Sequence, residues 1–266
     1  GKYPSLRAES PADRPALRRA WRRVVIGLAL VLGSTALLLA GVIEVDAVVF
    51  AGWATIGIVL FGALYLAYLL RFGGLEHNER NQVIAIFILS MAAAMFWAGF
   101  EQAGSTLNLF AERFTERNFD GFEIPTGWFQ TLNPVFIITL APVFATLWIR
   151  LAARGLEPRT PVKFACGLLI LGAGFGVMIV AAGLVNNGAK VLPTWLMMTY
   201  LLHTIAELTL SPVGLSVTTK LAPRRYAGQL MGVCFLTSAI GNLIAGLAAG
   251  RFSADAIEAM PALYTQ

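Results

Sequence analysis

The chain has 266 residues, of which 57% are hydrophobic and 13% charged, and its mean hydropathy is +0.70. A water-soluble chain carries about 25% charged residues, so this composition excludes an ordinary soluble domain. The formal net charge is +5, and the positions of the basic residues decide what that charge indicates.

The apolar residues form runs long enough to cross a membrane, which takes about 20 mostly apolar residues per helix. Strands of a membrane β-barrel would be about ten residues long with strict alternation, and these runs have neither property. The sequence therefore predicts an all-α polytopic membrane protein. Seven spans are predicted in chain order, near residues 24–43, 48–70, 83–110, 128–149, 164–185, 192–219 and 228–249.

Basic residues lie mostly on one side of these predicted spans. Residues 1–23 and every second connection after them hold 16 of the 20 lysines and arginines, and the opposite side holds 4. This is the positive-inside bias, and it predicts a multi-pass membrane protein with residues 1–23 as a cytoplasmic linker. Residues 1–17 are typical of a loop and not of a signal peptide. Because topology accounts for the charge, we expect no nucleic-acid partner.

The first two spans are predicted to form a transmembrane hairpin over residues 24–70. They contain almost no polar side chain beyond Ser34, Thr35 and Thr55, so we expect the hairpin to face lipid at the periphery. Residues 71–266 form the remaining domain, whose five spans carry charges, amides and prolines. Several glycines in the fifth and seventh spans indicate close helix packing, among them Gly167, Gly172, Gly174, Gly176, Gly241 and Gly246.

Two of the fifteen acidic residues, Glu101 and Glu207, lie deep in predicted spans. A carboxylate at the centre of a membrane helix costs about 2.5–3.5 kcal/mol, so such residues normally face a wet cavity or a partner. The alternative is a structural glutamate, either paired to another helix or held protonated. No lysine or arginine lies at matching depth in this chain, so a cationic partner would come from elsewhere.

Helical spacing places other polar residues on the same face as each carboxylate. The stripe on the third span comprises Trp97, Glu101, Ser105 and Asn108. The stripe on the sixth span comprises Thr199, His203, Glu207, Ser211 and Gly214. We interpret the two stripes as walls of one aqueous cavity, in which Trp97 would supply an apolar surface for an amphiphilic ligand. Helix packing is the other interpretation of Trp97.

Other residues in the spans leave alternatives open. His203 is either a proton relay beside Glu207 or a packing residue. Asn133, before Pro134 in the fourth span, either contacts substrate or satisfies backbone freed by the proline. Two histidines without a ligand cluster predict no metal site, and we expect no other cofactor. Cys166 and Cys234 both lie in spans and are interpreted as small core residues.

Three motifs in series resemble the proton-dependent oligopeptide transporter (POT) family of the major facilitator superfamily. They cover roughly residues 80–250. The first, similar to the family's seventh helix, is Phe96-Trp97-Ala98-Gly99-Phe100-Glu101-Gln102 followed by Ser105-Thr106-Leu107-Asn108. The second, similar to its eighth, is Trp128-Phe129-Gln130-Thr131-Leu132-Asn133-Pro134. The third, similar to its tenth, is Glu207-Leu208, Ser211-Pro212-Val213-Gly214-Leu215-Ser216 and Lys220-Leu221-Ala222-Pro223.

The resemblance implies a major facilitator fold, here the C-terminal helical bundle preceded by the inserted hairpin found in bacterial members. The chain would then hold this hairpin and helices seven to eleven, with helices one to six and twelve outside it. The N-terminal six-helix bundle of the same protein, the lipid bilayer, protons and a peptide are the partners that this implies. The family often has tryptophan where Cys234 stands, so a wider pocket is expected here.

The resemblance also implies roles for individual residues. Glu207 would bind the N-terminal ammonium of a peptide, and Asn133 a peptide carbonyl group. Trp97 would line a side-chain pocket with Ser211 adjacent. Glu101 would form an ion pair with basic residues of the N-terminal six-helix bundle. Protonation and substrate binding would make and break this ion pair.

These expectations add up to a proton-coupled symporter of di- and tripeptides that works by alternating access. Transport of another small solute, such as nitrate or an organic anion, is the alternative, although Glu207 argues against a purely anionic substrate. A seven-helix receptor would need an external N-terminus, against the charge bias. A membrane hydrolase would need a nucleophile with a base or metal, and only Glu207, Ser211 and His203 come near one. We therefore expect no enzyme.

Overall fold

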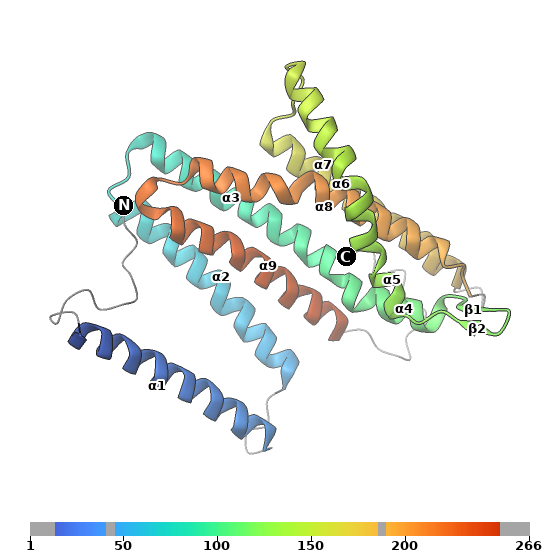
Figure 1. The fold of residues 1–266 in the computed structure, drawn as a ribbon, viewed down its shortest axis with the longest axis horizontal. Coiled ribbons are helices and arrows are strands. Elements are labelled where there is room, and N and C mark those ends of the chain that lie inside the picture. The colour runs from blue at the N-terminus through green and yellow to red at the C-terminus, as the bar shows by residue number, and fades with distance from the viewer. Residues whose placement is uncertain (1–13, 41–45, 186–189, 251–266) are drawn as a thin grey trace. The chain divides into compact units, whose positions relative to one another are not determined.

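The computed structural model describes residues 14–40, 46–185 and 190–250, and it is almost entirely helical (Figure 1). It divides into two compact units, residues 1–50 and 51–266, and each is described by itself. The long helices, in chain order, are α1 (Arg14–Leu39), α2 (Ala47–Phe72), α3 (His77–Phe100), α6 (Leu132–Ala153), α7 (Thr160–Val185), α8 (Thr194–Leu221) and α9 (Ala227–Gly250). Shorter elements are η2 (Glu101–Gly104), α4 (Thr106–Phe114), β1 (Asn118–Phe119), β2 (Phe122–Glu123), α5 (Gly127–Gln130) and η3 (Arg224–Tyr226).

Each of the seven predicted spans is found as a helix or a pair of helices. Five of them are long and apolar enough to cross a membrane: residues 48–72, 77–114, 127–153, 160–185 and 224–249. α8 is not among these five, although it has 28 residues. Its centre carries His203, Glu207 and several hydroxyl side chains, which lower its hydropathy. The all-α polytopic membrane fold is confirmed.

Two boundaries differ from the sequence-based expectation. α1 begins at Arg14, inside the segment interpreted as a linker, because the arginine-rich residues that follow are good helix formers. The fourth span starts as the single turn α5 before α6 continues from Leu132. In the second unit the residues of α2 are exposed or half-buried, except for Leu69, which is fully buried. That exposure is what a lipid-facing helix would have.

α7 and α8 pack closely because small residues lie between them. A Cβ added at Gly167 would lie 3.1 Å from the Leu210 Cβ, and one at Gly174 would lie 2.7 Å from the His203 Nε2. α3 and α9 also approach closely, since a Cβ at Gly241 would lie 2.8 Å from the Trp97 carbonyl carbon. The prediction of close packing is confirmed at these glycines. It is wrong at the others, because Cβ atoms at Gly172, Gly176 and Gly246 would meet nothing within 4 Å.

At one end of the second unit, η3, which precedes α9, is bound to the first turn of α3 and to the turn between α2 and α3. Arg225 forms a 2.6 Å ion pair with Glu79 and donates a 2.7 Å hydrogen bond to the Gly74 carbonyl oxygen. The Tyr226 hydroxyl donates a 3.0 Å hydrogen bond to the Gly73 carbonyl oxygen. Gly74 has φ +57°, a left-handed conformation that glycine adopts without steric cost.

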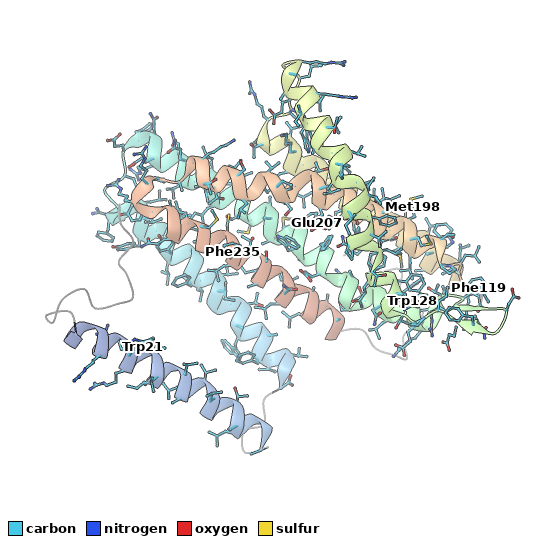
Figure 2. The ribbon with its side chains drawn as sticks, in the orientation of Figure 1. Trp21, Phe119, Trp128, Met198, Glu207 and Phe235 are labelled. Carbon is cyan, nitrogen blue, oxygen red and sulfur yellow. The ribbon has the colours of Figure 1, made fainter. Side chains whose placement is uncertain are left out.

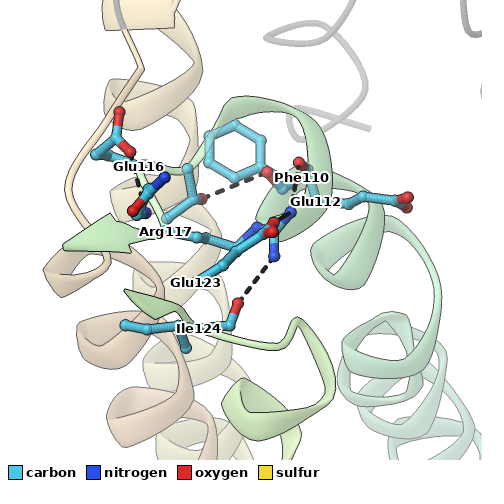
Figure 3. Close-up of polar contacts among 8 residues, drawn as sticks. Phe110, Glu112, Glu116, Arg117, Glu123 and Ile124 are labelled. Carbon is cyan, nitrogen blue, oxygen red and sulfur yellow. Dashed lines mark hydrogen bonds and ion pairs between the residues drawn. The ribbon is translucent and has the colours of Figure 1, made fainter. Parts of the chain in front are cut away.

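A short β-hairpin joins α4 to α5 and was not expected from the sequence. Its two central residues, Asp120 and Gly121, have φ 51° and 86°, as a two-residue hairpin turn with both φ positive requires. Arg117 forms a 2.8 Å ion pair with Glu123 and donates a 2.8 Å hydrogen bond to the Ile124 carbonyl oxygen (Figure 3). The Asp-Gly pair was the available sequence signal.

Candidate functional site

Glu207 and Asn133 meet near the middle of α8. The Asn133 Nδ2 donates a 3.0 Å hydrogen bond to the Glu207 Oε2 and a 3.1 Å hydrogen bond to the Thr204 Oγ1. Figure 2 shows Glu207 midway along α8. α6 and α8 pack against each other, and this brings together two residues that are 74 positions apart. Two of the sequence-predicted site residues are therefore in direct contact.

Prolines shape both helices of this contact. Pro134 lies in the first turn of α6, where a missing backbone N–H costs nothing. Asn133 therefore need not satisfy freed backbone, and its amide is directed to Glu207 and Thr204 instead. Pro212 lies inside α8, one turn beyond Glu207. It cannot donate to the carbonyl four residues earlier, at Leu208, so the backbone next to the carboxylate lacks that helical hydrogen bond.

Glu101 begins η2, a 3₁₀ turn between α3 and α4. The Tyr200 hydroxyl of α8 donates a 3.2 Å hydrogen bond to the Ala103 carbonyl oxygen in this turn. Within the same segment, the Thr106 Oγ1 donates a 2.8 Å hydrogen bond to the Gln102 Oε1. The Tyr200 hydrogen bond thus places the turn that begins at Glu101 against α8, the helix that carries Glu207.

The expected stripe from Trp97 to Asn108 is wrong, because the third span is not one continuous α-helix. α3 ends at Phe100, and Ser105 has φ −125° and ψ −93°, outside helical geometry. A 3₁₀ turn has about three residues per turn instead of 3.6, so positions beyond it no longer share the face of Trp97. Gly104 ends the 3₁₀ turn, where its lack of a side chain favours a break.

The expected stripe on α8 is also only partly correct. Thr199 and His203 are fully buried against α7. The Thr199 Oγ1 donates a 3.4 Å hydrogen bond to the Gly174 carbonyl oxygen, and the ring centres of His203 and Phe175 are 5.0 Å apart. Positions eight apart, such as 199 and 207, lie about 80° apart around a helix of 3.6 residues per turn. His203 makes no hydrogen bond to Glu207, so the packing interpretation of this histidine accounts for its contacts.

Tyr200 and Thr204 are the α8 residues that the sequence reasoning missed. Tyr200 precedes Glu207 by seven positions and so lies about 20° from it around the helix, and Thr204 lies about 60° from it. A spacing of seven residues stays closer to one helix face than repeated steps of four residues do. The sequence could have revealed Tyr200 by its spacing of seven residues from Glu207.

Trp97 and Ser211 make no hydrogen bond to Glu207 or Asn133, whose side-chain bonds are with each other and with Thr204. Trp97 packs edge-to-face against Phe96 and Phe100 at 5.5 Å and sits against Gly241 of α9. Ser211 is half-buried one turn beyond Glu207, and its hydroxyl makes no hydrogen bond to any described residue. Helix packing thus accounts for the contacts that Trp97 makes.

Neither deep carboxylate forms an ion pair with any residue in the described ranges. The ion pairs found there join Arg117 to Glu123, Lys163 to Glu157 and Arg225 to Glu79, and all involve the ends or connections of helices. No three His, Cys, Asp or Glu side chains in those ranges gather as a metal site would require. Glu101 and Glu207 are therefore two deep carboxylates without a cationic partner in the described part of the chain.

The two cysteines differ from the expectation that both belong to the core. Cys166 is exposed on α7 and Cys234 is half-buried. The Cys234 Sγ lies 2.8 Å from the Thr218 Oγ1 and 3.9 Å from the Ser90 Oγ. Cys234 therefore points at small polar residues of α8 and α3.

Known proteins match most of the length of this chain. The chain is 43% identical over 247 residues to the peptide transporter YePEPT of Yersinia enterocolitica, which covers 92% of this chain and 48% of that protein. It is 33% identical over 234 residues to dipeptide and tripeptide permease A of Chromobacterium violaceum, covering 88% of this chain and 45% of that protein. The chain spans about half the length of the curated relatives it matches.

Solved structures share the fold. The crystal structure of peptide transporter POT in complex with sulfate has a TM-score of 0.79 and 34% sequence identity, covering 96% of this chain and 50% of that chain. The family model described as the POT family matches residues 72–262, which include η2 with Glu101, α6 with Asn133 and α8 with Glu207. With this match over most of its length, the chain belongs to the POT family of membrane transporters.

Proposed function

We propose that this chain is the C-terminal part of a proton-coupled symporter of di- and tripeptides that works by alternating access. The observation that carries the proposal is Glu207, a carboxylate hydrogen-bonded to Asn133 and paired with no cation in the described part of the chain. A carboxylate at this depth is costly unless it meets a positive partner. The N-terminal ammonium of a peptide is such a partner, and relatives of the chain are named as peptide transporters.

The other site residues have roles that follow from the same proposal. Glu101 is the proton-coupling residue, and the Tyr200 hydrogen bond that joins its turn to α8 supports communication between proton and substrate. Asn133 contacts the peptide beside Glu207, and Trp97 lines the pocket for a substrate side chain, with Ser211 adjacent. The proton is the coupling ion, and the cycle needs no metal, no cofactor and no covalent chemistry.

The proposal includes a partner that supplies the missing positive charge. Relatives are about twice as long as this chain, which supports an N-terminal six-helix bundle of the same protein facing α3, α6 and α8. Basic residues of that bundle would pair with Glu101. The charge bias of the connections supports a multi-pass protein of the cell inner membrane with residues 1–23 in the cytoplasm, the hairpin 24–70 and the transporter bundle 71–266.

The test uses the intact transporter in proteoliposomes and follows uptake of labelled dialanine with and without an inward proton gradient. Wild-type protein should accumulate dialanine, and a protonophore should collapse the accumulation. Glu207→Gln keeps an oxygen for the Asn133 hydrogen bond but removes the charge, and it should abolish uptake. Glu101→Gln should leave exchange of peptide but remove accumulation driven by protons.

The matched control is Glu112→Gln, which removes an exposed carboxylate from α4 and should behave as wild type. Wild-type uptake by both Glu207→Gln and Glu101→Gln would contradict the site assignment. Absence of uptake by folded wild-type protein, with uptake of nitrate or another anion instead, would contradict the proposed substrate class.

A further inference from the structure

Thr204 is fully buried on α8, and its hydroxyl contacts Asn133 of the proposed substrate site. The Oγ1 donates a 2.7 Å hydrogen bond to the Tyr200 carbonyl oxygen, one turn earlier. A hydroxyl has a single hydrogen, and this bond uses it. Towards Asn133, 3.1 Å away, the Thr204 oxygen can therefore only accept.

This acceptor restricts the Asn133 side chain. An amide has one end that donates two hydrogens and one that only accepts, and the two ends are alike in shape. With the Nδ2 facing Thr204 and Glu207, both amide hydrogens are used, at 3.1 Å and 3.0 Å. The reverse orientation would set the Asn133 Oδ1 against the Thr204 oxygen, whose hydrogen is already used, and two acceptors would face each other.

The Glu207 carboxylate also selects this orientation, but only while it is an acceptor. A protonated carboxyl group can donate, and it would then tolerate the reversed amide. The Thr204 restraint has no such dependence, because the Tyr200 carbonyl keeps its hydroxyl hydrogen in either case. Thr204 is therefore the group that holds the amide in one orientation whatever the state of Glu207.

We propose that Thr204 is a positioning residue that fixes the Asn133 amide so that its Oδ1 is presented to the substrate. The Oδ1 makes no hydrogen bond to any residue that the structure describes. Asn133 then accepts a hydrogen bond from a peptide N–H group, whereas the family resemblance implied that it binds a carbonyl. The inference rests on the proposed peptide transport and specifies the chemistry of that site.

The test compares three threonine variants in the intact transporter. Thr204→Val keeps the shape and removes the hydroxyl, and it should raise the KM for dialanine roughly tenfold, which equals about 1.4 kcal/mol, with the maximal rate within about twofold. Thr204→Ser keeps the hydroxyl and should restore the wild-type KM. Thr209→Val is the matched control, because the Thr209 hydroxyl makes the same bond to the carbonyl four residues earlier, at Ile205, and no other.

The role of the Asn133 Oδ1 is tested with a second substrate. The ester analogue of dialanine has an oxygen where the peptide N–H stands. Wild-type protein should bind the ester roughly tenfold more weakly than dialanine, and Thr204→Val should reduce that ratio to about twofold or less. An unchanged ratio in Thr204→Val overturns the assignment of the Oδ1 as the acceptor.

A KM for Thr204→Val equal to that for Thr209→Val overturns the positioning role. Thermal unfolding in detergent checks that each variant is folded, and Thr204→Ala replaces the valine variant if that one is not. Absence of dialanine uptake by wild-type protein contradicts the proposed function itself. Wild-type uptake with unaltered Thr204 variants contradicts only the role of Thr204.

Discussion

Tyr200 and Ala103 connect α8 to the turn that carries Glu101. The Tyr200 hydroxyl donates a 3.2 Å hydrogen bond to the Ala103 carbonyl oxygen, and Ala103 lies in η2, which begins at Glu101. The carbonyl of the same tyrosine accepts the hydrogen bond from Thr204, which in turn holds Asn133. One residue of α8 therefore contacts the neighbourhoods of both deep carboxylates.

Tyr200→Phe removes one hydrogen bond and little volume. We expect the free energy of unfolding to fall by about 1 kcal/mol, because the Ala103 carbonyl loses its side-chain donor. Since η2 positions Glu101, the variant should also lose part of its proton-driven accumulation of dialanine while keeping peptide exchange. Thermal unfolding in detergent and proteoliposome uptake measure the two effects.

The matched control for that variant is Tyr226→Phe, whose hydroxyl bonds the Gly73 carbonyl oxygen at 3.0 Å, away from η2. It should lower stability by a similar amount and leave the ratio of accumulation to exchange unchanged. Equal ratios in the two variants would disprove the link between Tyr200 and Glu101.

Gly241→Ala should destabilise the protein through the contact between α9 and α3. The added Cβ would lie 2.8 Å from the Trp97 carbonyl carbon and 2.9 Å from the Ala98 backbone nitrogen, and backbone cannot move aside as a flexible side chain can. Overpacking of this kind costs roughly 1–3 kcal/mol. Gly246→Ala, on the same helix with nothing within 4 Å, should be neutral or slightly stabilising. Equal melting temperatures for the two variants would refute the contact.

Glu157, in the connection between α6 and α7, gives the stability a defined pH dependence. The hydrogen bond from Lys163, and then the charge of Lys163, hold the pKa of the Glu157 carboxyl below its ordinary value of 4.5, and Lys220 adds to this. A lowered folded-state pKa contributes stability that is present above pH 4.5 and is lost as the pH falls through the folded pKa. The effect is modest, because solvent and salt screen an exposed carboxylate.

The measurement is the melting temperature of wild-type protein and of Glu157→Gln from pH 7 to about pH 3.5. Wild type should melt higher at pH 7, and the difference should shrink as the pH falls below 4.5. Molar salt should also reduce the difference at pH 7, because the Debye length falls to about 3 Å. A gap that stays constant with pH would be inconsistent with the ion pair as its source.

Cys234→Trp tests the expectation that the pocket is wider where the family often has tryptophan. The Cys234 Sγ faces the Thr218 and Ser90 hydroxyls, so a tryptophan in the same direction would overpack the contact with α3 and α8. We expect a loss of roughly 1–3 kcal/mol of stability, whereas Cys234→Ser should stay within about 1 kcal/mol of wild type. A stable tryptophan variant with altered peptide preference would favour the wider pocket instead.

The spans and the two deep carboxylates could be predicted because their signals are local. Apolar runs of membrane length need no knowledge of neighbours, and the structure has a helix at each predicted span. Glu101 and Glu207 stood out because an isolated charge in such a run is costly anywhere. The serial motifs around them also predicted the family correctly, since residues 72–262 match its model.

The sequence predicted less reliably which residues share one face of a helix. Repeated steps of four residues drift by about 40° each around a helix, so the α8 stripe included Thr199 and His203, which pack on α7. The break at η2 escaped detection because a single glycine in an apolar run does not by itself end a membrane helix. Tyr200 and Thr204 were missed because the stripe before Glu207 was followed only in steps of four residues, to His203 and Thr199.

By itself, the sequence determined the all-α membrane class, the helical segments, the family and the identity of the two carboxylates that need a partner. These follow from hydropathy, from the cost of buried charge and from residues in series, all of which are properties of the chain read along its length. Only the tertiary structure decided that the Asn133 amide lies between Glu207 and Thr204 and that Tyr200 holds the Glu101 turn. Such hydrogen bonds join residues 71, 74 and 97 positions apart, and helix packing alone brings their atoms within bonding distance.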